Sequence, residues 1–218
     1  MQPPFAYGDH IVAALRSSVS AERLQRYEAM ARGDIAEALR LYMWNTALSE
    51  ALYGTIQGLE ITLRNKMHER LAARFGPRWY DVASVGLQYI QQDQVLRAKQ
   101  SLQQQGKPPD SPRIVAELSL GFWVGLFGRQ YENPLWRPHL RPLFVNAPRA
   151  FLRQDAHRVL DGARRLRNRI AHHEPILHRS LQQEYGLVLT AIGWLCGPTA
   201  SWVTHYSRFV DIYAARPS

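Results

Sequence analysis

Cysteine is almost absent from this chain of 218 residues, since Cys196 is the only one. A single cysteine cannot form a disulfide within the chain, so nothing indicates an oxidising compartment or a thiolate metal cluster. Long apolar runs are also absent, and no window approaches the roughly 18 apolar residues of a membrane span. The first residues lack the basic and apolar regions of a signal peptide. We therefore expect a soluble, cytoplasmic protein that does not bind membranes.

Acidic residues are scarce relative to basic ones. The chain has 18 Asp and Glu against 27 Lys and Arg, which gives a net charge of +9. This imbalance favours a polyanionic partner such as nucleic acid, although charge alone does not separate RNA from DNA. Arginine outnumbers lysine, and arginine binds phosphate with two parallel hydrogen bonds. The alternative is a protein from an arginine-rich proteome.

Alternating β-branched runs are missing as well, so we predict an all-α fold. Apolar periodicity and helix-capping residues predict helices over about 10–18, 21–32, 35–74, 86–104, 111–128, 148–173, 179–196 and 199–214. Prolines at 134, 138 and 142 restrict residues 129–147 to short helical turns. The length fits a single compact domain, with an N-terminal helical extension over 1–33 and the main helical domain over 34–218.

The helix predicted over 35–74 has apolar residues at spacings of three and four, which predicts the spine of the core. These positions are Leu41, Trp44, Asn45, Leu48, Leu52, Ile56, Leu59, Leu63, Met67 and Leu71. The segment from Leu120 to Gly128 is apolar on all sides and predicts a central packed element. Its three glycines do not match a phosphate-binding loop.

The stretch from Arg164 to Pro175 combines four arginines, an asparagine and two histidines near a predicted helix end. Asn168 and His172 share a helical face, and Arg167 joins them only where the helix frays or bends. A histidine that exchanges protons near neutral pH, beside a fixed cation, suits phosphoryl transfer without metal. The histidine removes a proton from a 2′-hydroxyl, and the arginine stabilises charge in the transition state.

Three other interpretations compete. The first takes Arg164, Arg165, Arg167 and Arg169 as a solvated face and His172 as a capping side chain, and on spacing alone it is favoured. A zinc protease would use His173 and Glu174, but the spacing is HExxxH with a proline inside, so this is excluded. A nucleophilic triad is unsupported, because no histidine lies near Cys196 in sequence and no serine lies in a nucleophile elbow.

A second polar feature lies on the long predicted helix. Glu60 and Arg64 are spaced to form an ordinary helical salt bridge, which contributes about 0.3–0.5 kcal/mol. If Glu60 instead lies beside the motif helix, it can orient Arg167 or His172. We therefore expect Glu60 and Arg64 to support the site, together with His173, which follows His172 in the sequence. Arg164, Arg165, Arg169 and Lys66 are the expected RNA-binding residues.

The segment from Arg167 to Ile176 resembles the signature of Abi-like (abortive infection) proteins, a branch of the HEPN superfamily. The resemblance extends to residues 42–45 and 59–65 and to the block from Ile114 to Trp123. Tyr131 and Leu135-Trp136 follow in the expected order. Altogether it covers residues about 34–195.

This resemblance implies a HEPN-like helical bundle, here with additional N-terminal helices. It also implies a metal-independent endoribonuclease, active as a homodimer and without a cofactor. His172 would be the general base or acid, Arg167 the transition-state cation and Asn168 the residue that orients them. The family's biology is toxin-like phage defence, and a small regulatory RNA or an antitoxin is a candidate partner. The alternatives are a non-catalytic RNA-binding module or a dimeric interaction subunit.

Overall fold

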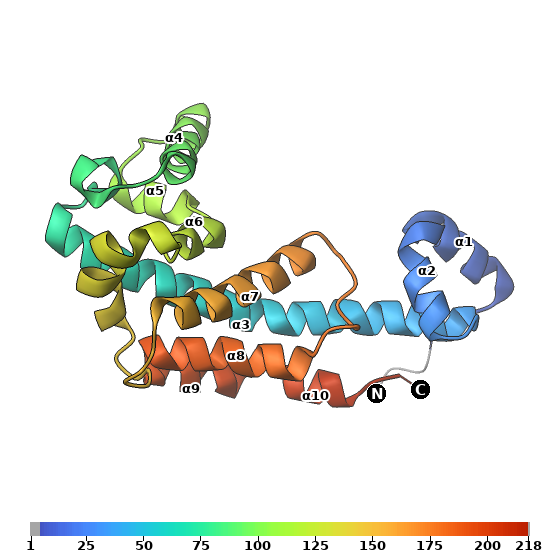
Figure 1. Ribbon diagram of the computed structural model, residues 1–218. Coiled ribbons are helices and arrows are strands. Elements are labelled where there is room, and N and C mark those ends of the chain that lie inside the picture. Colours follow the sequence, from blue (N-terminus) through green and yellow to red (C-terminus); the bar gives the residue numbers. More distant parts are fainter. Residues whose placement is uncertain (1–4, 218) are drawn as a thin grey trace. The chain divides into compact units, whose positions relative to one another are not determined.

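The computed structural model describes residues 5–217, and its regular structure over that range is entirely helical (Figure 1). The all-α prediction is therefore confirmed. The α-helices are α1 (Asp9–Val19), α2 (Ala21–Met30), α3 (Ile35–Phe75), α4 (Tyr89–Gln104), α5 (Ser111–Glu117), α6 (Leu120–Gly125), α7 (Arg153–Ala171), α8 (Leu181–Leu195), α9 (Gly197–Tyr206) and α10 (Phe209–Ala214). A helix with the length and apolar character of a membrane span is absent from residues 5–217.

Helix α3 is the longest element, and its bounds match the predicted ones closely. The Asp34 side chain accepts a hydrogen bond from the Glu37 amide at 3.0 Å, which caps its start. Gly76, with φ +88°, follows its end. The predicted apolar stripe is buried from Leu41 to Leu71, except that Trp44 is half-buried. The spacing rule therefore identified the core face of α3 correctly.

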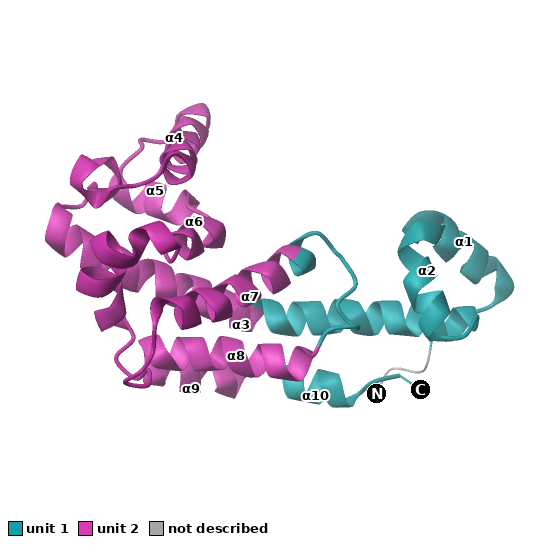
Figure 2. Ribbon diagram, in the orientation of Figure 1, with its two compact units in different colours: residues 1–53, 169–179, 207–218 teal, residues 54–168, 180–206 magenta. Residues whose placement is uncertain are grey.

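Contacts along the chain gather into two compact units (Figure 2). Unit 1 contains the described residues up to Tyr53 together with 169–179 and the residues from 207 on. Unit 2 contains residues 54–168 and 180–206. This division does not coincide with the boundary expected after residue 33. The reason lies in unit 1, where Tyr27 and Ala31 of the N-terminal segment share an apolar cluster with Ala38, Leu41 and Leu177.

Unit 2 has an aromatic core. Trp79 packs against Phe122 and Trp123, with ring centroids 6.2 and 6.0 Å away, and all three side chains are buried. A second group joins Phe127, Trp136, Phe144, Phe151 and Trp194 through ring contacts. The prediction that the aromatic, glycine-containing segment after Leu120 is a central packed element is confirmed.

Glycine permits a close approach between two helices of unit 2. A Cβ atom added at Gly58 of α3 would lie 2.8 Å from Cγ2 of Val203 on α9. Only a residue without a side chain fits there, since real Cβ contacts are longer. Gly54, one turn earlier, has nothing within 4 Å of the same position. The two glycines thus have different structural roles.

Two predicted helices have wrong bounds. The helix expected over 111–128 divides into α5 and α6, because Leu118 is extended and its carbonyl accepts a hydrogen bond from the Trp123 indole at 3.2 Å. The helix expected from residue 148 begins at Arg153 instead. Its start is fixed where the Leu152 amide donates to the Asp155 carboxylate at 3.1 Å.

Two further segments differ in detail from the prediction. The last predicted helix divides into α9 and α10. The proline-containing segment 129–147 forms short helical pieces, as predicted, but one of them, Glu132–Leu140, is a π-helix. The Glu132 carboxylate pairs with Arg137 at 3.2 Å and with Arg153 at 2.8 Å. The pair with Arg153 ties the π-helix to the start of α7, whereas the pair with Arg137 lies within the π-helix.

Candidate functional site

The end of α7 is a closed turn that carries the two motif histidines. The His173 amide donates to the Ile170 carbonyl at 3.1 Å, and the Glu174 amide donates to the Arg169 carbonyl at 2.8 Å. This pair of bonds is the Schellman motif, in which the residue after the cap adopts a left-handed conformation. His173 occupies that position with φ +56°. Glycine is usual there, so a histidine costs about 1 kcal/mol or more.

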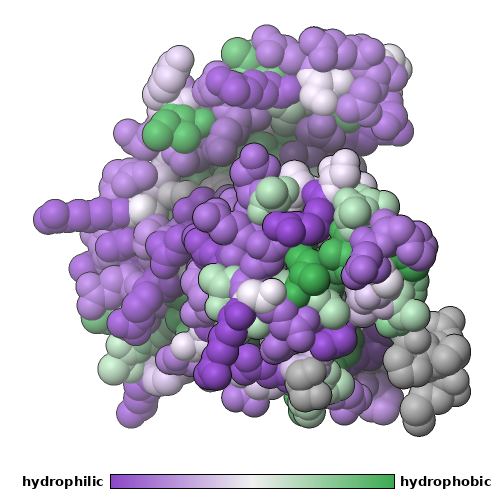
Figure 3. Space-filling model, turned by 90° about the vertical axis from the view of Figure 1, so that its right-hand side faces the viewer, coloured by the Kyte–Doolittle hydropathy of each residue, from purple (hydrophilic) through white to green (hydrophobic). Residues whose placement is uncertain are grey.

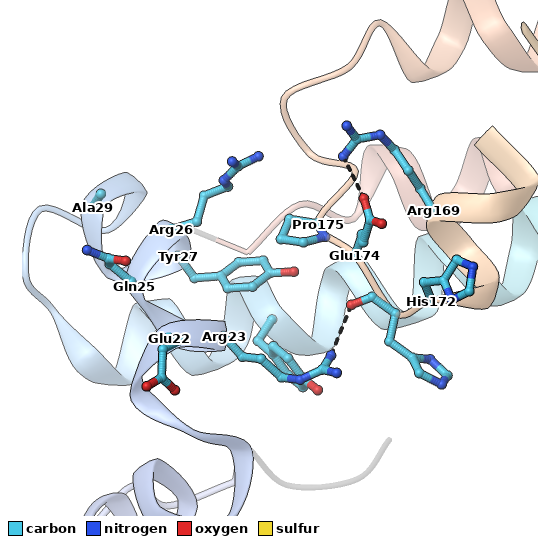
Figure 4. Close-up of a pocket in the computed structure, with 12 residues that line it drawn as sticks. Glu22, Arg23, Gln25, Arg26, Tyr27, Ala29, Arg169, His172, Glu174 and Pro175 are labelled. Carbon is cyan, nitrogen blue, oxygen red and sulfur yellow. Dashed lines mark hydrogen bonds and ion pairs between the residues drawn. The ribbon is translucent and has the colours of Figure 1, made fainter. Parts of the chain in front are cut away.

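This turn lies at one wall of an open groove of about 790 Å³ within unit 1. The opposite wall is α2, as the close-up shows (Figure 4). The lining residues are Glu22, Arg23, Gln25, Arg26, Tyr27, Ala29, Tyr42, Arg169, His172, His173, Glu174 and Pro175. His172 and His173 are exposed. Both imidazoles are therefore accessible to a ligand in the groove.

Hydrogen bonds connect α2 to the segment that follows the motif. Arg23 donates from Nη1 to the carbonyl oxygen of His173 at 3.3 Å, an interaction visible in Figure 4. Arg26 Nη1 lies 3.3 Å from Nδ1 of His178. A guanidinium can only donate, so this ring nitrogen is the acceptor. The N-terminal segment thus contributes a wall of the candidate site.

A buried tyrosine, Tyr27, and a half-buried one, Tyr42, also line the groove. Tyr27 is 1% exposed and meets Tyr42 edge to face, with centroids 5.5 Å apart. Burial, with a smaller contribution from Tyr42, raises the pKa of Tyr27 to about 12. Its hydroxyl points toward Glu174 and Pro175 in Figure 4. Tyr27 is therefore neutral over the physiological pH range and serves as a packing element.

A buried hydrogen bond anchors the chain just beyond the groove. The Ile176 amide donates to Oδ1 of Asn45 at 2.8 Å, and both residues are buried. An unpaired amide there would cost free energy, because water cannot replace the lost partner. Asn45 was predicted only as a member of the α3 core face. Its polar side chain inside an apolar stripe is the signal that could have indicated this role.

Arg169 lines the groove but is already paired. Its Nη1 lies 3.1 Å from Oε2 of Glu174, and both side chains are partly exposed. The positive charge of Arg169 is therefore partly offset within the site.

Arg23 and Arg26, which also line the groove, were not predicted from the sequence as site residues. Their spacing of three residues on the polar face of α2 is the only local signal they carry.

The other motif residues belong to unit 2, because the division between the units falls after Asn168. Nε of Arg167 lies 4.0 Å from Oε2 of Glu60, a long ion pair between half-buried groups. Asn168 is half-buried, and its side chain has no hydrogen-bond partner among the residues described. The position of Glu60 near Arg167 agrees with the expectation that Glu60 lies beside the motif helix.

Glu60 and Arg64 do not form the local ion pair that their spacing allows within this described part of α3. Nε of Arg64 instead lies 3.4 Å from Oδ1 of Asn65. Lys66 is on another side of α3, where it lines a hollow of about 340 Å³ with Cys196 and Trp202. Lys66 is thus separate from the Glu60–Arg167 pair.

The first two arginines of the motif are paired to one carboxylate. Asp161, one helical turn earlier, lies 2.7 Å from Arg164 and 2.6 Å from Arg165. Two guanidinium groups and one carboxylate leave a net charge of +1 on that face. Asp161 therefore offsets part of the charge that the predicted RNA-binding role of Arg164 and Arg165 needs, and its spacing of three and four residues from them is visible in the sequence.

Cys196 follows the end of α8 and is half-buried. Hydrogen bonds to Thr199 lower the pKa of its thiol. Within residues 5–217, no three His, Cys, Asp or Glu side chains are arranged to hold a metal ion.

Comparisons with models of protein families, with curated proteins and with solved structures find no match to this chain.

Proposed function

We propose that this protein is a metal-independent endoribonuclease of the toxin or abortive-infection type, with a HEPN-like fold. The observation that carries the proposal is the groove in unit 1, which exposed His172 and His173 line together with two arginines of α2. A basic groove attracts a polyanion, and an accessible imidazole can transfer protons near neutral pH. The motif resemblance supplies the rest, namely the roles of Arg167 and Asn168.

The proposed reaction is transesterification within the RNA backbone. His172 takes the proton of a 2′-hydroxyl, whose oxygen attacks the adjacent phosphorus. Arg167 stabilises the extra negative charge on the phosphorane-like transition state. The bond to the 5′-oxygen then breaks, and that oxygen takes up the proton that the imidazole removed, which returns His172 to its starting form. The products are a 2′,3′-cyclic phosphate and a 5′-hydroxyl end, with no net consumption of water.

The supporting residues have assigned parts in this proposal. Glu60 limits the freedom of the Arg167 guanidinium, and Asn168 orients the reacting groups. His173 lies beside His172 on the groove. By the same resemblance, the active species is a homodimer in which both copies contribute Arg167 and His172. A small regulatory RNA or an antitoxin would restrain the activity in the cell.

The test compares the wild type with His172→Ala and with a matched control, His205→Ala. His205 is an exposed histidine on α9, away from the groove lining. Each protein is incubated with total RNA in chelator, and the new RNA ends are mapped. Wild type and control should leave 2′,3′-cyclic phosphates, while His172→Ala cleaves at least about 100-fold more slowly. Intact RNA with or without metal, or equal cleavage by His172→Ala, would refute the proposal.

The same experiment addresses the non-catalytic alternative. An RNA-binding module would retain RNA without producing new ends, and Arg167→Ala would weaken binding only. A dimeric interaction subunit would bind no RNA, and Arg167→Ala would change the solution mass alone. Measuring cleavage, RNA affinity and solution mass on one set of variants separates the three functions.

A further inference from the structure

Arg23 and Arg26 differ from the four arginines of the motif, because neither of them is paired with a carboxylate in the part of the chain that the structure describes. Arg164 and Arg165 pair with Asp161, and Arg169 pairs with Glu174. Arg23 and Arg26 instead contact a backbone carbonyl and an imidazole, neither of which is a carboxylate. Each guanidinium has five N–H donors, so most of its donors stay available after one such bond. The α2 wall therefore carries two positive charges that no carboxylate among residues 5–217 offsets by an ion pair.

The position of this wall is fixed by packing. Leu24 and Tyr27 of the same helix are 0% and 1% exposed, so α2 is anchored by buried side chains. Arg23 and Arg26 themselves are exposed, so their head groups reach water while the helix that carries them is anchored. Their contacts to His173 and His178 restrict the two side chains further. Both charges are thus held on the groove that His172 lines.

The groove offers no aromatic surface on which a base can stack. Its aromatic residues other than the histidines are Tyr27, which is buried, and Tyr42, which is half-buried beneath it. Stacking on exposed aromatic rings is the usual way to bind unpaired bases. Viewed from the side of α1 and α2, the surface is mostly hydrophilic, and its hydrophobic residues form small patches (Figure 3). Binding of a nucleic acid in this groove therefore depends on charged side chains, which contact phosphates rather than bases.

We propose that Arg23 and Arg26 form a phosphate subsite, which holds the backbone of an RNA strand beside His172 with little regard to base sequence. The identity of the ligand as RNA rests on the proposed function. The subsite itself rests on the two exposed arginines, which lie on one groove without a carboxylate partner among residues 5–217. In this arrangement α2 positions the strand, and the motif histidine acts on a neighbouring phosphodiester.

The test measures binding to a probe that cannot be cut. A labelled oligonucleotide of about 12 nucleotides with 2′-O-methyl groups presents an RNA backbone without the attacking hydroxyl. Two base sequences are compared over a range of salt concentrations by fluorescence anisotropy. Arg23→Gln or Arg26→Gln should lower the salt slope by about 0.7 and weaken binding about fivefold at about 0.1 M salt. The effect should be equal for both sequences.

Three further variants separate charge from structure. Arg208→Gln is the matched control, because Arg208 is an exposed arginine of unit 1 outside the groove, paired with Glu50. It should bind as the wild type does. Arg23→Lys keeps the charge and should stay within about twofold. Gln25→Lys adds a charge to the same wall and should strengthen binding about fivefold, which tests the subsite without removing any contact.

The subsite is refuted if the Gln variants keep the wild-type affinity and slope, or if Gln25→Lys gives no gain. It is also refuted if Arg23→Lys loses as much as Arg23→Gln, because only a structural role predicts that. Cleavage of unmodified RNA is followed in parallel. Binding losses with no cleavage by the wild type would uphold the subsite and refute the endoribonuclease. Cleavage that is lost in His172→Ala but unchanged in the Arg23 and Arg26 variants would uphold the endoribonuclease and refute the subsite.

Discussion

The two compact units of this chain differ in what their side chains are used for. Unit 2 is filled by large aromatic residues such as Trp79, Phe122 and Trp123, which contact one another. Unit 1 has a smaller apolar cluster around Tyr27 and Leu41, and its polar residues line the groove. The comparison indicates that packing of large aromatic rings dominates unit 2, while unit 1 carries the groove on which exposed imidazoles and guanidinium groups meet.

Removing a central ring from unit 2 should have the largest effect. Trp123 is fully buried, contacts Trp79 and Phe122, and donates a hydrogen bond to the Leu118 carbonyl. Trp123→Ala should lower the free energy of unfolding by about 3–5 kcal/mol, because it leaves a large cavity. Urea unfolding followed by circular dichroism measures this loss. A loss below about 1 kcal/mol would contradict the assignment of the core to these rings.

Removing the anchor of unit 1 should have a smaller effect. Asn45→Ala leaves the buried Ile176 amide without a partner, which should cost about 1–3 kcal/mol. Hydrogen exchange should accelerate at Ile176 and in the neighbouring turn, and the proposed cleavage by His172 should fall with it. Asn45→Asp keeps an acceptor and is the control for the hydrogen bond. Unchanged exchange at Ile176 in the alanine variant would show that Asn45 does not hold this segment.

A matched pair of glycines tests the tight packing of unit 2. Gly58→Ala places a methyl group 2.8 Å from Val203, which should cost about 1–2 kcal/mol after the gain in helix propensity. Gly54→Ala meets no neighbour and should stabilise the protein by up to about 1 kcal/mol. A lower midpoint of thermal unfolding for Gly58→Ala and a higher one for Gly54→Ala would support the close approach of α3 and α9. Stabilisation by both substitutions would rule it out.

The smallest expected effect concerns the turn that carries the motif histidines. His173→Gly relieves the left-handed conformation at φ +56° and should stabilise the protein by roughly 0.5–1 kcal/mol. If its imidazole supports catalysis, cleavage should fall while stability rises. His173→Asn tolerates the same conformation and serves as the control for loss of the ring. Destabilisation by glycine would mean that the turn is not strained.

The parts of the fold that were predictable depend on local pattern. Helix α3 was predicted because its apolar residues recur at spacings of three and four, and Asp34 and Gly76 mark its ends. The break between α5 and α6 was not, because Leu118 and Ser119 carry no glycine or proline signal. That break depends on the Trp123 side chain binding the Leu118 carbonyl, a contact that no local propensity encodes.

The candidate site was predictable only on one side. The motif histidines were identified from their neighbours in sequence, whereas Arg23 contacts His173 across 150 positions of the chain. No single sequence reveals such a pairing. Glu60 shows the same limit, because its spacing favoured Arg64 and it lies instead near Arg167. Asp161 was different, since its pairing with Arg164 and Arg165 follows from local spacing alone.

The hydrogen bond between Arg23 and His173 also has a consequence for protein synthesis. The residues of unit 1 come from the start of the chain, from 169–179 and from the last residues, where the Trp44 indole donates to the Ile212 carbonyl at 2.7 Å. A ribosome makes these pieces at widely separated times, since chains emerge N-terminus first. The groove therefore cannot form until the segment that carries His172 and His173 has been made, and α2 is synthesised long before its opposite wall.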